Sequence, residues 1–401
     1  MFLDIVIALI LGVGTGIITG LTPGLHINLV SVLVLSFSPF LLQITSPIVL
    51  GVYIIAMAIT HTFLDALPSI YLGAPDEAQA LNVLPGHRLL MRGEGHNAVL
   101  CTVIGALGVI ILGILFFPLF IFLMKWLAEP VTGIVGYLLI IIVIYMIWRE
   151  KDKKLEALTL FLLSGALGLL VFSIPNLEQP LFPLLSGLFG FSILLISLLQ
   201  KSIIPKQKLN QPLNLSKKNL VKSVSGATGM GFIAAFLPGF GSSQAAIIAT
   251  NVVGDIGDEG FLTLVGGINT ANMLISIAAA YILNKSRNGA ILVVNKLLDG
   301  MSVETMLIFL AVSLVAAGLA ALLTISISKI FANVIVKVKY SYIVWGIIIF
   351  IAILAGYFDG FIGLTILATA TALGLISSVW GVGKNHLMGC LLIPVILYFV
   401  L

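Results

Sequence analysis

Leu21-Thr22-Pro23-Gly24-Leu25-His26-Ile27-Asn28 places a proline-glycine pair and several polar side chains inside a long apolar run. Between Asp4 and Asp65 the sequence holds no Asp, Glu, Lys or Arg, so the run is too apolar and too long for a soluble core. In hydrocarbon every backbone N–H and C=O needs a partner within the protein. A Pro-Gly interruption is therefore tolerated only where it is packed in protein or lines a wet cavity. The stretch is a candidate binding site.

The same pattern returns 215 positions later in the chain. Gly14, Gly16, Pro23 and Gly24 correspond to Gly229, Gly231, Pro238 and Gly239, and Asn28 falls on Ser243. These identities in one register indicate an internal duplication, with a first repeat in 1–200, a linker in 201–222 and a second repeat in 223–401.

Composition places the chain among multi-pass membrane proteins. It has 401 residues, of which 60% are hydrophobic and 9% charged, and a mean hydropathy of +1.20. The net charge of +4 comes from lysines clustered in short loops, which is typical of membrane topology and not of nucleic-acid binding. Cys101 and Cys390 both lie in apolar runs, so we expect no disulfide framework, no metal site and no cofactor.

Apolar runs of about 17–25 residues are long enough to cross a bilayer. The first half holds seven, at 4–20, 25–44, 47–67, 98–124, 131–148, 157–174 and 181–200. The second half holds seven more, at 223–238, 240–254, 260–283, 303–328, 340–356, 361–377 and 386–401. The predicted fold is an all-α membrane protein of two repeats with broken helices at the Pro-Gly loops, although the first two runs of each half could instead form a re-entrant hairpin. A short helix is predicted from about Asp76 to Leu84.

The charges of the loops predict the orientation in the cell membrane. Six lysines and no acid lie between Lys201 and Lys222, so this linker is predicted to be cytoplasmic. Alternation then places the Arg88/Arg92 segment, 149–154 and Lys384 inside, and it places the loops at 125–130 and 175–180, Asp359 and both termini outside. An odd number of runs per half means that the repeats are inverted, which is typical of secondary transporters that bind substrate near the bilayer midplane.

The two Pro-Gly breaks are predicted to bind an anion. A helix that restarts after Pro-Gly presents free N–H groups and a partial positive charge. One break alone would indicate a simple kink, but two breaks with polar followers favour a site. The candidate residues are Thr22, Pro23, Gly24, His26 and Asn28 in the first break, and Pro238, Gly239, Gly241, Ser242, Ser243 and Gln244 in the second.

Further polar residues lie within the apolar runs. His61 and Asp65 are four apart on one helix face and are candidates for binding a coupling H⁺ or Na⁺, although Asp65 lies near a span end where it could simply contact water. Asn269 and Asn272 are three apart, and a Gly pair precedes them, which favours a ligand-facing role. A second pair of re-entrant segments contributes the candidates Pro75, Asp76, Arg287 and Asn288. An intramembrane enzyme built on His61 and Asp65 would lack a nucleophile or metal set, so we expect no enzymatic activity.

Several motifs resemble the TctA family, the large permease subunit of tripartite tricarboxylate transporters. They are Gly20–Leu25, Ile70–Pro75, Leu84–Gly95, Leu237–Gly241 and Thr270–Asn272, and they follow one another in order over most of the chain. The resemblance implies uptake of carboxylates driven by an ion gradient, with a small membrane subunit and an extracytoplasmic binding protein as partners. The chain departs from the family pattern at Ala74-Pro75-Asp76 and Ser286–Gly289, where the family usually has Pro-Gly pairs, at Asn269, where it has an acid, and at Met273, where it has a second Asn.

The leading prediction is an ion-coupled transporter of small organic anions such as di- and tricarboxylates, working by alternating access. The alternative is a polyprenyl-phosphate translocase, because paired Pro-Gly loops also occur in those proteins and a lipid phosphate would suit the same helix termini. Both hypotheses place the chain in the lipid bilayer without a nucleic-acid partner. The oligomeric state stays open, with a homodimer as one option.

Overall fold

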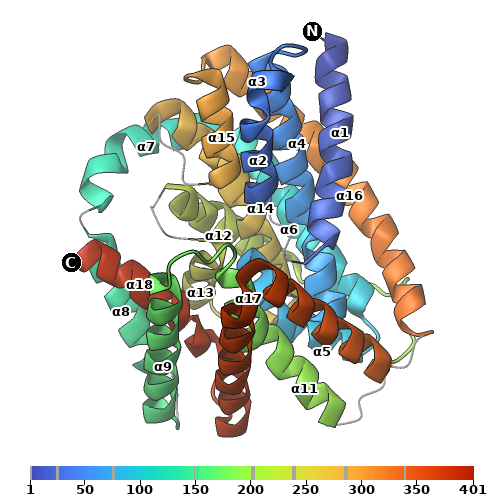
Figure 1. Ribbon diagram of the computed structural model, residues 1–401, viewed down its shortest axis with the longest axis vertical. Coiled ribbons are helices and arrows are strands. Elements are labelled where there is room, and N and C mark those ends of the chain that lie inside the picture. The colour runs from blue at the N-terminus through green and yellow to red at the C-terminus, as the bar shows by residue number, and fades with distance from the viewer. Residues whose placement is uncertain are drawn as a thin grey trace.

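The computed structural model (Figure 1) is helical throughout the residues that it describes, with no strand among them. These residues are 2–23, 27–74, 77–132, 134–148, 150, 152–199, 204–236, 241–283, 288–337 and 340–401. Seven helices in this part of the chain are long and apolar enough to cross a membrane. The all-α membrane class predicted from the sequence is confirmed.

The described part of the first half contains eleven α-helices and three shorter helical segments. They are α1 (Phe2–Leu21), α2 (Ile27–Ser36), α3 (Ser38–Leu41), α4 (Pro47–Leu64), the π-helix η1 (Pro68–Leu72), the 3₁₀-helix η2 (Glu77–Asn82), α5 (Val83–Met91), α6 (Gly95–Leu115), α7 (Phe117–Thr132), α8 (Val135–Trp148), α9 (Lys154–Ser173), α10 (Leu181–Leu185), the π-helix η3 (Ser186–Phe191) and α11 (Ser192–Leu199).

The second half contains seven α-helices and one 3₁₀-helix among its described residues. They are α12 (Lys217–Phe236), α13 (Ser242–Val253), α14 (Gly257–Leu283), α15 (Gly289–Leu298), α16 (Val303–Ile335), α17 (Tyr340–Trp380), η4 (Lys384–Met388) and α18 (Gly389–Val400). α12 is displaced from α1 by 215 positions at both ends, and α13 begins 215 positions after α2. The helix boundaries thus repeat in the register of the glycine pattern, while the inversion of the halves stays a prediction.

The expected count of seven spans per half is wrong, because several runs are not long straight helices. α2 has 10 residues and α13 has 12, which at about 1.5 Å per residue is too short for a core of about 30 Å. These two helices fit the alternative of a re-entrant hairpin and not a full span. Phe117 and Pro118 begin a new helix, because proline cannot donate the backbone hydrogen bond that would continue α6. The expected loop at 125–130 therefore lies within α7.

α17 joins the two runs that were predicted separately at 340–356 and 361–377. Its dihedral angles are non-helical only at Gly360, where φ is 59° and ψ is −145°. Glycine adopts a positive φ at little cost, so the chain bends here without a loop. Asp359 at this bend accepts hydrogen bonds from the backbone N–H groups of Glu178 and Gln179, at 2.7 and 3.1 Å. The loop charges predict that Asp359 and the loop at 175–180 both lie outside the membrane, and the structure brings these two segments into contact.

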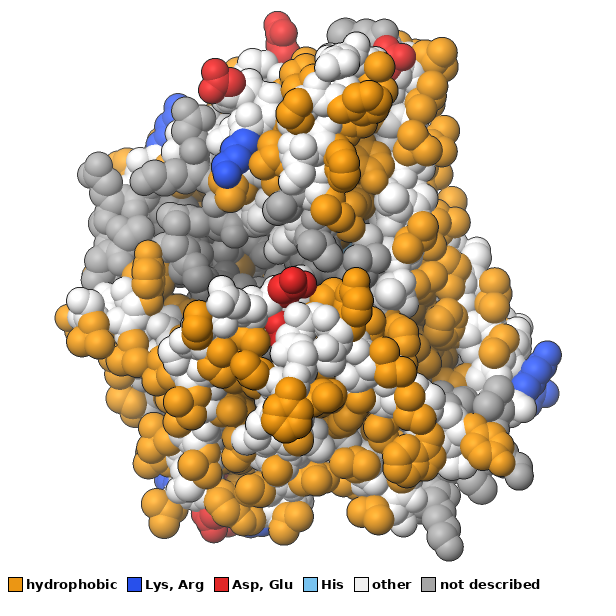
Figure 2. Space-filling model, viewed as in Figure 1, with side chains coloured by type: hydrophobic (Ala, Val, Ile, Leu, Met, Phe, Trp, Pro, Cys, Tyr) orange, Lys and Arg blue, Asp and Glu red, His pale blue; other side chains and the backbone are white. Residues whose placement is uncertain are grey.

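α4 and α14 form the centre of the molecule. Among the seven candidate spans, Pro47–Leu72, which contains α4, and Gly257–Leu283, which is α14, are the most buried. In the most apolar stretch of each, 83% and 89% of the residues are buried. α4 packs against α1 and α16, and α14 packs against α12 and α6 (Figure 1). Outside this core, apolar side chains cover much of the surface, as Figure 2 shows for one face, which suits contact with lipid.

Glycines allow the central helices to approach closely. Gly12, Gly16 and Gly20 of α1 face α4, where a Cβ would meet the backbone or β-carbons within 2.5–2.8 Å. Gly105 of α6 faces α14, and a Cβ there would lie 1.9 Å from the carbonyl oxygen of Thr263. Small residues at such crossings are the usual means of tight packing between membrane helices.

We expect Gly105→Ala to destabilise the protein, because the added methyl group would push a backbone carbonyl that cannot move independently. Overpacking of this kind costs about 1–3 kcal/mol. The expected result is a lower apparent Tm, measured as the loss of monodisperse protein on heating in detergent. Gly318→Ala is the matched control, since a Cβ added at Gly318 would meet no atom within 4 Å. An equal Tm for the two variants would contradict the packing.

Candidate functional site

Both predicted breaks separate two helices. α1 ends at Leu21, Pro23 is buried, and α2 begins at Ile27. α12 ends at Phe236, and α13 begins after Gly241, whose backbone is extended. The interruptions therefore occur where the sequence predicts them. Gly24, His26, Pro238 and Gly239 lie outside the described residues, as does the side chain of Gln244.

The second break brings several candidate residues together at the start of α13. Ser242 and Ser243 are buried in its first turn. Asn272 on α14 lies close to Ser242, with 3.4 Å between Nδ2 and Oγ. Hydroxyl and amide groups next to the free backbone N–H groups of a helix N-terminus can bind a carboxylate or a phosphate.

At the first break, Asn28 lies against the start of α15. A Cβ at Gly289 would be 2.7 Å from Asn28 Oδ1, so glycine is needed for this approach. Asn288 caps α15, because its side chain accepts a hydrogen bond from the Ala290 N–H at 2.9 Å. Thr22 is half-buried next to the break. Pro75, Asp76 and Arg287 lie outside the described residues.

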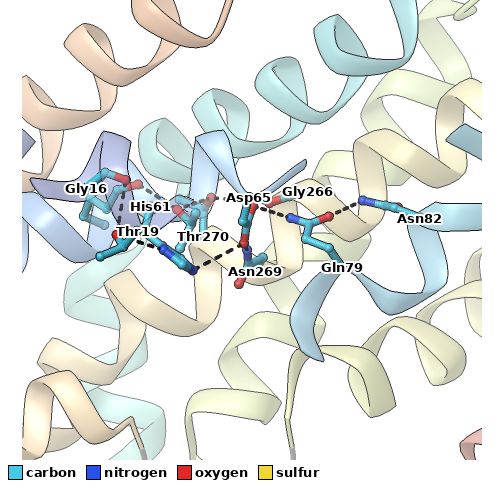
Figure 3. Close-up of polar contacts among 11 residues, drawn as sticks. Gly16, Thr19, His61, Asp65, Gln79, Asn82, Gly266, Asn269 and Thr270 are labelled. Atoms are coloured by element: carbon cyan, nitrogen blue, oxygen red, sulfur yellow. Dashed lines mark hydrogen bonds and ion pairs between the residues drawn. The ribbon is translucent and has the colours of Figure 1, made fainter. Parts of the chain in front are cut away.

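Asp65 is the centre of a buried polar network between the two halves (Figure 3). Its Oδ1 accepts from Gln79 Nε2 at 2.8 Å and its Oδ2 accepts from Asn269 Nδ2 at 2.6 Å. His61 Nε2 lies 4.0 Å from Oδ2, and His61 Nδ1 lies 3.1 Å from Thr19 Oγ1. Asp65 is 2% exposed, so the alternative that it is simply wet at a span end is wrong.

Three members of this network were not predicted from the sequence. Thr19 lies on the glycine-rich face of α1, and Gln79 and Asn82 lie on η2. Gln79 and Asn82 belong to a segment that is too polar to span the membrane, and this polarity was the only signal for them. Thr62 of α4 and Thr270 of α14 add a second link between the halves, with 3.0 Å between their hydroxyl oxygens.

η2, which carries Gln79 and Asn82, also contributes Ala80 and Leu81 to the lining of a cavity of about 750 Å³. The lining comes from η2, α5, the end of α8 and the residue Glu150 after it, η3, α13, α14, the loop between α13 and α14, and the start of η4. It includes Ala80, Leu84, Arg88, Glu150, Thr250, Asn251, Asp255, Asp258 and Lys384. Three segments that were predicted to be inside, at Arg88, Glu150 and Lys384, therefore meet at one cavity. The side of the membrane on which it opens stays a prediction.

Polar side-chain contacts connect the elements around the cavity. Arg88 of α5 contacts Asp258 of α14 at 2.7 Å, and His386 contacts Glu150 at 3.1 Å. Burial lowers the pKa of His87 to about 4, so His87 is neutral at pH 7 and Arg88 supplies the positive charge at this point of α5.

Comparison with known proteins assigns the family. The model of the tripartite tricarboxylate transporter TctA family matches residues 6–389. An uncharacterized protein of Methanocaldococcus jannaschii is 28% identical over 408 residues, which cover 98% of each chain. No solved structure matches the chain. With nearly its whole length matched, this chain belongs to the TctA family of tripartite tricarboxylate transporters.

Proposed function

We propose that this chain is the permease that moves a small organic anion across the cell membrane, driven by an ion gradient. The observation that carries the proposal is the pair of helix breaks, with buried hydroxyl groups at the start of α13 and Asn272 beside them. Free backbone N–H groups and hydroxyl donors suit a carboxylate, and a re-entrant helix pair places such donors inside the membrane. Di- and tricarboxylates are the substrates that we expect.

The coupling ion is proposed to bind at His61 and Asp65, because they are the titratable pair at the interface of α4 and α14. H⁺ and Na⁺ are the two candidates. The 750 Å³ cavity is proposed as the cytoplasmic vestibule through which the anion leaves. The termini are then extracytoplasmic and the linker at 201–222 is cytoplasmic. Movement of one half against the other would alternate access to the break.

Partners follow from the family. We propose a small membrane subunit and an extracytoplasmic binding protein that delivers the anion. A homodimer is one option for the oligomeric state.

The test is a substrate panel on the purified protein in liposomes. Uptake of radiolabelled di- and tricarboxylates is measured with and without Na⁺ and with and without an inward proton gradient, and binding of a polyprenyl phosphate is measured in parallel. We expect saturable uptake of at least one carboxylate that requires one of the two gradients. Binding of the polyprenyl phosphate without any carboxylate uptake would favour the lipid-phosphate translocase instead.

A further inference from the structure

Lys384, the first residue of η4, carries a buried amine and is 9% exposed. Its Nζ donates to Ser192 Oγ at 2.7 Å and to the carbonyl oxygen of Gly374 at 3.1 Å. The carbonyl oxygen of Leu188 lies farther away, at 3.5 Å. All three partners are neutral, and no carboxylate of the described residues lies within 4.0 Å of Nζ. A buried charge without an opposite charge is costly, and inside membrane proteins such a group usually serves a ligand or a pathway.

The oxygen acceptors around Nζ are brought together by a close approach of two helices. A Cβ added at Gly374 of α17 would collide with the carbonyl oxygen of Leu188 and would lie 2.7 Å from the Cβ of Ser192, so glycine is needed here. Leu188 belongs to the π-helix η3, and π-helical turns are frequent at functional sites.

The hydrogen bonds leave one donor of the ammonium weakly used. Ser192 Oγ donates to the carbonyl oxygen of Leu188 at 2.8 Å, so its lone pairs can accept from Lys384 Nζ. An ammonium has three donors and no acceptor. Ser192 and Gly374 each take one donor at short distance, whereas the contact with Leu188 is at the limit of a hydrogen bond. The third N–H is therefore the one that a ligand can take.

Lys384 also lines the 750 Å³ cavity. The lining residues include one other cation, Arg88, which contacts Asp258 at 2.7 Å. Of the described residues around the cavity, Lys384 is thus the cation with no carboxylate in contact. The acids of the lining repel an anion, so Lys384 is the group that can attract one. These acids are Glu150, Asp255 and Asp258.

The cavity and the second break lie at opposite ends of α13. Ser242 begins this helix at the break, and Thr250, eight residues later, lines the cavity. At about 1.5 Å per residue these two positions are about 12 Å apart along the helix axis. A small anion cannot contact both ends of α13 at once, so an anion in the cavity occupies a position separate from the break.

We propose that Lys384 binds a carboxylate of the transported anion in the cavity, at a second site beyond the break. The N–H that Leu188 holds weakly donates to a carboxylate oxygen, and the ligand supplies the negative charge that the buried ammonium lacks. The class of anion rests on the proposed function, because the same ammonium can also bind a phosphate.

The experiment measures how far a bound anion slows thiol labelling of Thr250→Cys, a position in the cavity lining. The purified protein in nanodiscs reacts with the uncharged reagent N-ethylmaleimide at constant pH and matched ionic strength, and mass spectrometry gives the rate. The added compounds are succinate, citrate, inorganic phosphate and the uncharged dimethyl succinate. The native Cys101 and Cys390 are buried, and their protection verifies that the protein stays folded.

We expect succinate or citrate to slow labelling in a saturable way, and dimethyl succinate to have no effect. Adding Lys384→Gln should raise the half-protecting concentration by at least about tenfold, because one hydrogen bond between charged groups is lost. Glutamine keeps two N–H donors for Ser192 and Gly374, and Lys384→Met, which removes charge and donors together, should give the same loss. Lys218→Gln, at an exposed lysine, is the matched control and should leave protection unchanged.

Three outcomes would overturn the site. Absence of protection by both carboxylates while Lys384 is present would exclude the cavity, and this result needs no variant of Lys384. Undiminished protection in Lys384→Gln would exclude the ammonium, and protection by phosphate alone would exclude the carboxylate.

Labelling needs no ion gradient, so its result can be separated from that of the uptake assay. Carboxylate protection in a protein that shows no uptake would refute the proposed transport and leave the Lys384 site in place. Uptake of a carboxylate that never protects Thr250→Cys would refute the Lys384 site alone.

Discussion

Replacing Asp65 by asparagine is expected to abolish the accumulation of substrate against its gradient. Asparagine cannot carry the charge that pairs with a coupling ion, and its single oxygen cannot accept from both Gln79 and Asn269. A driving force of 100 mV on one charge is worth about 2.3 kcal/mol, so accumulation should fall by roughly 50-fold, to the equilibrium level. The measurement is the ratio of internal to external labelled carboxylate in liposomes.

Exchange of internal for external substrate should persist in the Asp65→Asn variant, because the anion site at the breaks is unchanged. Asp152→Asn, at an exposed loop position, is the matched control and should accumulate substrate normally. If the Asp65→Asn variant still concentrated substrate, Asp65 would have no part in coupling.

Replacing Pro238 and Gly239 by alanines should abolish substrate binding while leaving membrane insertion intact. Alanine is the best helix former, so α12, which ends at Phe236, could continue into α13, which begins at Ser242. The N–H groups of the first turn of α13 would then bond to helix carbonyls and no longer be available to an anion.

The expected effect is large. A hydrogen bond to a charged group contributes about 1.5 kcal/mol or more, so the loss of two should lower the affinity by at least about 100-fold. Affinity is measured by equilibrium binding of labelled carboxylate to protein of confirmed monodispersity. The matched control changes Pro394, inside α18, and Gly346, where a Cβ has open space, to alanine. Wild-type affinity in the Pro238-Gly239 variant would remove the break from the binding site.

Local chemistry made several features predictable from the sequence. Long uncharged runs require a membrane, and proline and glycine end a helix wherever the neighbouring residues do not compensate. The helix class, the two breaks and the end of α9 at Ser173 follow from such rules. The pairing of His61 with Asp65 also follows, because residues four apart on a helix always share a face.

The count of spans could not be predicted in the same way, because hydropathy reports that a segment is buried but not whether protein or lipid buries it. α2 and α13 are apolar and still too short to cross. Hydropathy also fails to show where a long apolar run divides. The run at 98–124, predicted as one span, divides at Phe116 into α6 and α7.

The amino-acid sequence by itself determined that this protein lies in a membrane, that one Gly/Pro pattern occurs twice 215 positions apart, and which two stretches interrupt its helices. Only the tertiary structure decided that Gln79 and Asn269, 190 positions apart, donate to the two oxygens of one buried carboxylate. The physical reason is that helix periodicity is a local property, whereas the partners of a buried charge depend on how distant helices pack, and glycines at the crossings of α1 with α4 and of α6 with α14 set that packing.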